Sequence, residues 1–230
     1  MLKLDECRIA NGAFTLNADL VIGTGSRVAV IGPSGAGKST LLEAIAGFRD
    51  LHRGNVYWKQ TNLTSLSPGK RSIAMLFQDG NLFPHMTAEQ NVALGLRPSG
   101  KLSESERNRV DAALVRVGLT GMGTRKPSEL SGGQQSRAAL ARVLVQKREL
   151  LLLDEPFAAL GPALKTEMLD LVSALAVETG TTLLMVSHAP EDARRIADQT
   201  VLVADGIAQP PVPTFALFEN PPPALRDYLG

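Results

Sequence analysis

The residues best suited to chemistry form a glycine-rich segment that ends in a lysine and a serine. Residues 32–39 read GPSGAGKS, which matches the phosphate-binding pattern G-x-x-x-x-G-K-[ST] in full. Its glycines allow successive N–H groups to turn toward phosphate oxygens, and a helix that begins here adds partial positive charge. We expect Lys38 to reach the β- and γ-phosphates of ATP and Ser39 to ligate Mg²⁺. A glycine-rich turn with a chance lysine is the weaker alternative. The expected nucleotide-binding residues are Gly32, Pro33, Ser34, Gly35, Ala36, Gly37, Lys38, Ser39 and Thr40.

A second candidate group is a pair of carboxylates at the end of an apolar run. Residues 150–155 read LLLLDE, which is typical of a buried strand of a parallel sheet. Ligands of such sheets bind beyond the carboxyl ends of the strands, so the two acids should face the same crevice as the glycine-rich segment. We expect Asp154 to hold Mg²⁺, directly or through water, and Glu155 to polarise the attacking water as general base. Solvation of a strand end is the alternative for such a pair taken alone.

These groups require an alternation of strands and helices to position them. The run RVAVI at 27–31 predicts a strand that leads into the glycine-rich segment, and Leu41, Leu42, Ile45 and Phe48 then recur at helical spacing. Further strands are predicted at 72–77, 150–153, 182–186 and 200–203, and helices are predicted to begin near Pro162 and Pro190. The pattern indicates an α/β fold.

The middle of the chain is predominantly helical. Ser103 and Glu106 have the spacing of a capping box, and an apolar face follows at Val110, Ala113, Leu114 and Val117. Another helix is predicted to begin at Ser131 and to run through Leu144. We therefore predict one domain over 1–230, with a nucleotide-binding core at 1–78 and 149–230 and a helical subdomain at about 79–148. The proline-rich end should lie over the surface with a short terminal helix.

Composition excludes several other functions. The formal net charge is +1, from 24 Lys+Arg and 23 Asp+Glu, so nucleic acid is not an expected partner. Cys7 is the single cysteine, so an internal disulfide is impossible. The N-terminal residues MLKLDECRIA do not resemble a secretion signal. The longest apolar runs are of strand length, well below the roughly 20 residues of a membrane helix.

The order of motifs resembles the ATP-binding subunits of ABC transporters over essentially the whole chain. The glycine-rich segment is followed by Gln78, by LSGGQ at 130–134, by LLLLDEP at 150–156 and by His188 after an apolar strand. The resemblance implies a P-loop NTPase (RecA-like) core with a mostly parallel sheet, an N-terminal antiparallel β part and an inserted α-helical subdomain. Without that context, LSGGQ could equally be an ordinary serine cap with flexible glycines.

The resemblance also implies roles for residues outside the first two motifs. Two subunits would pair head to tail, with each ATP between the phosphate loop of one copy and the LSGGQ helix of the other. Gln78 would contact Mg²⁺ or water, and His188 would contact the γ-phosphate and help to position Glu155. The residues expected to contact ATP of the opposite copy are Ser131, Gly132, Gly133 and Gln134.

Several stretches are similar to subunits of bacterial importers, those for thiamine in particular. They are GPSGAGKSTLLEAIAGF, SIAMLFQDGNLFPHMTAEQNVALGL, LLLLDEPFAAL and LLMVSHAPEDARRIAD. Iron, polyamine and molybdate importers share much of the pattern and are the alternatives. The resemblance implies a peripheral protein at the cytoplasmic face of the cell inner membrane, an integral membrane permease as partner, and a periplasmic binding protein that acts indirectly.

The permease is expected to dock at residues 78–96. Leu82, Phe83, Met86 and Val92 would line a groove there, or they would simply pack the helical insertion.

Two positions depart from the family pattern. Asn11 stands where the family has an aromatic residue that stacks on adenine, and Phe14 is the nearest ring. Either Phe14 takes over or ATP binds more loosely, by about 0.5–1.5 kcal/mol of stacking. Gly161 stands where the family has an aspartate that contacts the opposite phosphate loop, so we expect slower or less tightly coupled hydrolysis.

Two other protein classes share part of this pattern. A soluble ABC ATPase of DNA repair or translation would carry a long coiled-coil insertion or a second cassette, and this chain has neither. A phosphate-loop kinase for a small metabolite has no use for the LSGGQ helix.

Overall fold

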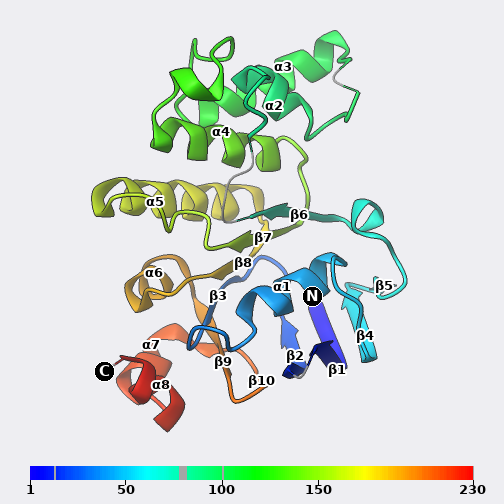
Figure 1. Ribbon diagram of the computed structural model, residues 1–230, viewed down its shortest axis with the longest axis vertical. Coiled ribbons are helices and arrows are strands. Elements are labelled where there is room, and N and C mark those ends of the chain that lie inside the picture. Colours follow the sequence, from blue (N-terminus) through cyan, green and yellow to red (C-terminus); the bar gives the residue numbers. More distant parts are fainter. Residues whose placement is uncertain (13, 78–81, 100, 230) are drawn as a thin grey trace.

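The computed structural model describes residues 1–12, 14–77, 82–99 and 101–229. Figure 1 shows their arrangement. The strands are β1 (Leu2–Asn11), β2 (Phe14–Ile22), β3 (Arg27–Ile31), β4 (Arg53–Trp58), β5 (Thr61–Asn62), β6 (Ile73–Leu76), β7 (Leu150–Asp154), β8 (Thr182–Val186), β9 (Gln199–Ala204), β10 (Ile207–Ala208) and β11 (Val212–Pro213). The helices are α1 (Lys38–Ala46), α2 (Ala88–Ala93), α3 (Glu104–Arg116), α4 (Gly132–Leu144), α5 (Pro162–Thr179), α6 (Pro190–Ile196), α7 (Thr214–Glu219) and α8 (Pro223–Leu229).

The strands form an 11-stranded sheet in the order β5-β4-β1-β2-β10-β9-β3-β8-β7-β6, with β11 beside β9. β9, β3, β8, β7 and β6 are parallel, so their carboxyl ends lie at one edge. Residues 150–153 of β7 are buried on both sides, as expected for a strand covered by helices on both faces. Leu150 and Leu152 pack in the core that contains α1, whereas Leu151 and Leu153 pack in the core that contains α4 and α5.

The N-terminal part of the sheet is antiparallel. β1 pairs with β2 and β4, and β4 pairs with β5. Buried and exposed residues alternate along most of β2, because only one face of this part packs against the core. Cys7 is buried here, and its thiol donates a hydrogen bond to the carbonyl of Asn55 at 3.2 Å.

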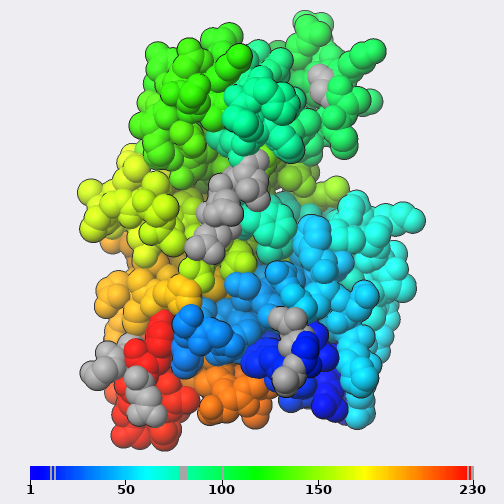
Figure 2. Space-filling view, in the orientation of Figure 1, coloured from blue at the N-terminus to red at the C-terminus, as the bar shows by residue number. Residues whose placement is uncertain are grey.

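Three helices form a group of their own between β6 and β7. α2, α3 and α4 occupy the upper part of the molecule in Figures 1 and 2, while both termini lie toward the lower end. Each of the three helices begins with a complete capping box, made by Thr87 with Gln90, Ser103 with Glu106, and Ser131 with Gln134. The starts at Ser103 and Ser131 are confirmed as predicted, and so is the fold class.

Local packing differs from the sequence pattern in two places. Phe48 continues the helical spacing of Leu41, Leu42 and Ile45, but α1 ends at Ala46, Gly47 turns the chain at φ 88°, and Phe48 is 57% exposed. The proline-rich C-terminal segment does more than lie over the surface. Leu217, Phe218 and Leu225 of α7 and α8 are buried against β3 and β9 in a third core. No helix of the described residues is long and apolar enough to cross a membrane.

Candidate active site

The glycine-rich segment is a tight loop between β3 and α1. Gly32 has φ 147° and Gly37 has φ 101°, in the region that favours glycine. A Cβ at Gly32 would lie 2.0 Å from the carbonyl oxygen of Val203, and one at Gly37 would lie 2.8 Å from Cζ of Phe14. The loop therefore passes too close to its neighbours for side chains at these two positions. Ser34 and Gly35 are exposed at its outer side.

Lys38 begins α1 and is folded back over this loop. Its Nζ donates hydrogen bonds to the carbonyls of Gly32 and Pro33, both at 2.8 Å, and the residue is 4% exposed. Burial lowers the pKa of the Lys38 amine, and the carboxylates of Glu155 and Asp154 act in the opposite direction. The ammonium is thus already at the loop, held by two carbonyls that phosphate oxygens could replace.

Asp154 ends β7 beside the first turn of α1. The hydroxyl of Ser39 donates a hydrogen bond to Oδ1 of Asp154 at 2.9 Å. Burial raises the pKa of the Asp154 carboxyl, and the hydrogen bond from Ser39 lowers it. Mg²⁺ prefers one or two protein oxygens together with substrate phosphates and water, and this pair offers two such oxygens. Among the described residues no group of three or more His, Cys, Asp or Glu side chains could hold a metal ion.

Glu155 and His188 meet across the ends of neighbouring strands. His188 follows β8, and its Nε2 lies 2.5 Å from Oε1 of Glu155. Glu155 has φ 46°, an uncommon conformation for a residue with a side chain, and its N–H bonds the carbonyl of Val186 at 3.2 Å. Its carboxylate is 13% exposed and the imidazole of His188 is 47% exposed. A largely buried carboxylate held by an imidazole is suited to accept a proton from water.

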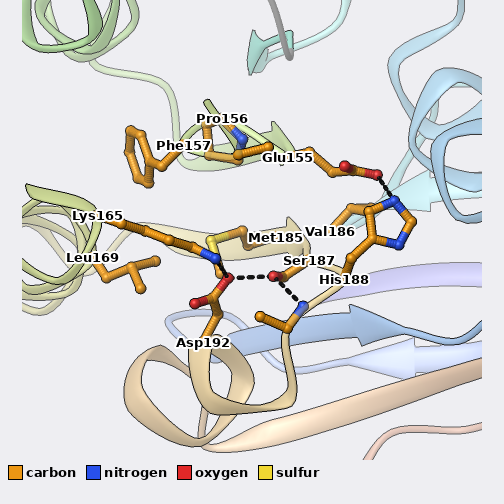
Figure 3. A pocket seen from close by; sticks show the side chains of 12 residues that line it. Glu155, Pro156, Phe157, Lys165, Leu169, Met185, Val186, Ser187, His188 and Asp192 are labelled. Atoms are coloured by element: carbon orange, nitrogen blue, oxygen red, sulfur yellow. Dashed lines mark hydrogen bonds and ion pairs between the residues drawn. The ribbon is translucent and has the colours of Figure 1, made fainter. Parts of the chain in front are cut away.

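A cavity of about 230 Å³ lies behind this pair. Figure 3 shows Glu155 and His188 joined at one side and Lys165, Ser187 and Asp192 joined at the other. The cavity is lined by Glu155, Pro156, Phe157, Ala158, Lys165, Leu169, Met185, Val186, Ser187, His188, Ala189 and Asp192.

The LSGGQ segment lies elsewhere in the same chain. Ser131 is exposed and caps α4, with its Oγ accepting from the N–H of Gln134 at 3.3 Å. α5 and strands β6–β8 lie between α4 and α1 in Figure 1. A Cβ at Gly133 would meet Leu164 at 2.3 Å, whereas one at Gly132 would meet nothing within 4 Å. Packing within this chain therefore explains Gly133 but leaves Gly132 unexplained.

The remaining residues predicted from the sequence lie in several different places. Gln78 lies outside the described residues, and so does the side chain of Asn11. Phe14 is half-buried and lies against Gly37 of the phosphate loop. Gly161 is the N-cap of α5 without a side-chain hydrogen bond.

Only some of the side chains expected to line a docking groove at residues 78–96 are exposed. Val92 is fully buried in the helical core and Leu82 is half-buried against it, which supports the packing interpretation for both. Phe83 is 47% exposed. The sequence analysis did not identify Phe48 and Phe77 as part of a surface site. Their exposed rings meet edge to face, with centroids 5.4 Å apart. The aromatic types were visible in the sequence, but the exposure of Phe48 depends on where α1 ends.

Comparisons with known proteins find similar proteins along the whole chain. Residues 16–158 match the family model described as ABC transporter. The thiamine import ATP-binding protein ThiQ of Ruegeria sp. (strain TM1040) is 65% identical over 230 residues, covering all of both chains. The protein of that name from Cereibacter sphaeroides is 60% identical, also over the full length of both.

Two solved structures that resemble this chain are dimeric cassettes. A dimeric bacterial ABC transporter cassette gives a TM-score of 0.81 at 31% identity, covering 93% of this chain and 99% of that chain. A dimeric ATP-binding cassette in a post-hydrolysis state, bound to ADP and Pi, gives a TM-score of 0.80 at 31% identity with the same coverage.

Proposed function

The chain belongs to the ABC transporter family, and from this premise we propose that it is the ATP-hydrolysing subunit of a bacterial importer of thiamine. The relatives that are 65% and 60% identical over its full length carry the name of thiamine import ATP-binding proteins. The observation that carries the ATPase assignment is the meeting of Lys38, Ser39, Asp154, Glu155 and His188 at one edge of the parallel sheet.

We assign the phosphate-binding roles to the loop and to the start of α1. Backbone N–H groups of residues 32–39, apart from Pro33, and the ammonium of Lys38 would bind the β- and γ-phosphates. Ser39 and Asp154 would hold Mg²⁺, with Gln78 contributing at the same ion or at water. When bound, Mg²⁺ would neutralise charge on the phosphate oxygens.

Glu155 is the proposed general base. Its carboxylate would take a proton from water as the water attacks the γ-phosphorus in line with the leaving ADP oxygen. His188 would contact the γ-phosphate and keep Glu155 in place through the 2.5 Å contact of its Nε2. In this assignment, charge that develops in the transition state is met by Lys38, Mg²⁺ and the Ser131 helix end of a second copy.

The proposed partners follow from the separation of the phosphate loop and the LSGGQ segment within one chain. Two copies would pair head to tail, so that Ser131, Gly132, Gly133 and Gln134 of one close over ATP on the phosphate loop of the other. As the importer assignment implies, a separate permease would provide the path across the inner membrane, at whose cytoplasmic face this chain would bind. A periplasmic binding protein would deliver thiamine to that permease.

We propose the exposed aromatic side chains as part of the permease contact. Phe77 and Phe83 are 37% and 47% exposed and flank the segment that contains Gln78 in the sequence, and Phe48, 57% exposed, meets the Phe77 ring edge to face. Aromatic side chains, phenylalanine included, are enriched in protein interfaces relative to the rest of the surface.

A pair of glutamine substitutions tests the ATPase assignment. Glu155→Gln removes the proposed base while keeping its shape, so ATP hydrolysis should fall at least about 100-fold with nucleotide binding retained. Glu191→Gln, at an exposed carboxylate of the nearby α6, should hydrolyse ATP at the wild-type rate. Hydrolysis by the Glu155→Gln protein at the wild-type rate would refute the assignment.

Uptake measurements test the substrate. Cells that lack this chain should lose ATP-dependent uptake of labelled thiamine and keep uptake of iron, polyamine and molybdate. Loss of one of the other solutes, with thiamine uptake intact, would replace thiamine in the proposal.

A further inference from the structure

The loop that carries His188 is fixed on one side by a buried polar network. The hydroxyl of Ser187 accepts a hydrogen bond from the N–H of Ala189 at 3.1 Å and donates one to Oδ2 of Asp192. Nζ of Lys165, in the first turn of α5, lies 2.7 Å from the same oxygen. Ser187 and Asp192 are 6% and 7% exposed. Figure 3 shows this network on the side of the loop away from Glu155. It ties the loop to α5 and α6 but does not contact the imidazole.

A further attachment of the loop comes from the C-terminal helix. The hydroxyl of Tyr228 on α8 donates a hydrogen bond to the carbonyl of His188 itself. Burial raises the pKa of the Tyr228 hydroxyl, and the nearby carboxylates of Glu155 and Asp192 act in the same direction. The phenol therefore remains protonated at neutral pH and able to donate.

α8 is held well enough to serve as a support. Leu225, one turn before Tyr228, is 0% exposed, and it shares a core with Leu217 and Phe218 of α7 and with Ile31 of β3. Arg194 of α6 also lies over the Phe218 ring at 4.2 Å. The phenol is thus the end of a packed element that rests on the same strand that leads into the phosphate loop.

On the basis of the proposed ATPase function, we infer that Tyr228 is a positioning residue, which fixes the backbone of His188 and through it the imidazole against Glu155. The side chain of His188 is 47% exposed, and its contact with Glu155 is a single one of 2.5 Å. A ring so little enclosed depends on its own backbone for its position. The C-terminal helix would then contribute to hydrolysis without touching the nucleotide.

Substitution of Tyr228 by phenylalanine removes the hydroxyl and keeps the ring that packs against α7. In the full chain, Tyr228→Phe should lower kcat for ATP about fivefold, as expected for the loss of one hydrogen bond, and leave the KM for ATP unchanged. Tyr57→Phe is the matched control, because Tyr57 is the other tyrosine of the sequence and is likewise half-buried, on β4 in the antiparallel part.

The imidazole signals give a readout that does not depend on ATPase activity. The sequence has three histidines, His52, His85 and His188, so their ring C–H resonances can be assigned by single substitutions. Tyr228→Phe should move the His188 resonance and leave the other two in place.

The two readouts separate the possible outcomes. A His188 resonance that stays in place overturns the inference, whatever the rate, and so does movement of all three, which would indicate general unfolding. A moved His188 resonance with unchanged kcat overturns the catalytic part. Absence of ATPase activity in the wild-type chain would refute the proposed function instead, and the resonance test would still decide whether Tyr228 positions His188.

Discussion

Glu155, His188 and Gly161 show how much the candidate site depends on single positions. Glu155 is held in the left-handed region at φ 46° so that its carboxylate meets His188. Backbone conformations of this kind cost of order 1–3 kcal/mol and persist where surrounding structure enforces them. Gly161 is the opposite case, since no feature of the folded chain requires a glycine there. Its φ is −63°, and an added Cβ would meet nothing within 4 Å.

Gly161→Asp should therefore fold without strain and raise ATPase activity. The carboxylate would cap α5, which stabilises the chain by a few tenths of a kcal/mol, and would reach the opposite phosphate loop. A new hydrogen bond of about 1 kcal/mol there would raise the hydrolysis rate about fivefold. Steady-state phosphate release measures the rate, and thermal unfolding measures the stability.

Gly161→Asn is the control, because asparagine caps a helix as well as aspartate but carries no charge. Both variants should gain stability, and the larger gain in rate should belong to aspartate. An unchanged ATPase rate in Gly161→Asp would show that the missing carboxylate does not limit hydrolysis.

At the scale of elements, the start of α4 contains a glycine, Gly132, that packing within one chain does not explain. Gly132 is exposed at the first position of the helix, and no acidic residue occupies the first turn. An acidic side chain near a helix N-terminus is favourable by about 0.3–1 kcal/mol. A purely structural helix start would therefore gain from a carboxylate at Gly132, whereas a helix start that faces ATP would not tolerate one.

Gly132→Asp should for this reason raise the thermal stability of the chain and lower ATP hydrolysis together. Like charges 4 Å apart repel by about 4 kcal/mol near a protein surface, so the loss in rate should exceed about tenfold. Gly132→Asn, of the same shape but neutral, should lose less activity. If Gly132→Asp keeps the wild-type rate, α4 does not face a nucleotide.

Local patterns predicted much of the fold, and long-range packing accounts for what they missed. The capping box at Ser103 and the helix starts at Ser131, Pro162 and Pro190 were predictable, because each depends on residues within one turn. The burial of Leu225 was not, since it depends on a contact with β3 almost 200 positions earlier in the chain.

In the candidate site, too, motifs predicted some residues and only the packing of the chain shows the others. The motifs predicted Lys38, Ser39, Asp154, Glu155 and His188, and the sheet does bring them together. Tyr228 and Lys165 carry no motif, and their relation to His188 follows only from the packing of α8 and α5. The roles of all these side chains in hydrolysis, and those of Gln78 and Ser131, stay predictions.

At the scale of the whole molecule, the phosphate loop and the LSGGQ segment lie in different parts of the chain, although one ATP would contact both. The phosphate loop lies between β3 and α1 at the carboxyl edge of the parallel strands, and Ser131 lies at the start of α4 in the helical group. In Figure 1, α5 and several strands lie between α4 and α1. The neighbouring solved structures are dimers. A single chain should therefore bind ATP with half of a site, and a second copy should supply the rest.

Mixing two inactive variants tests this composite site most directly. Lys38→Ala removes the phosphate-loop cation, and Gly132→Asp disables the LSGGQ helix, so each protein alone should hydrolyse little ATP. A mixed dimer joins the intact phosphate loop of one to the intact helix of the other. Half of the dimers in an equal mixture are mixed, each with one of two sites restored, so activity should return to about a quarter of the wild-type rate. A mixture no more active than its two components would contradict the account.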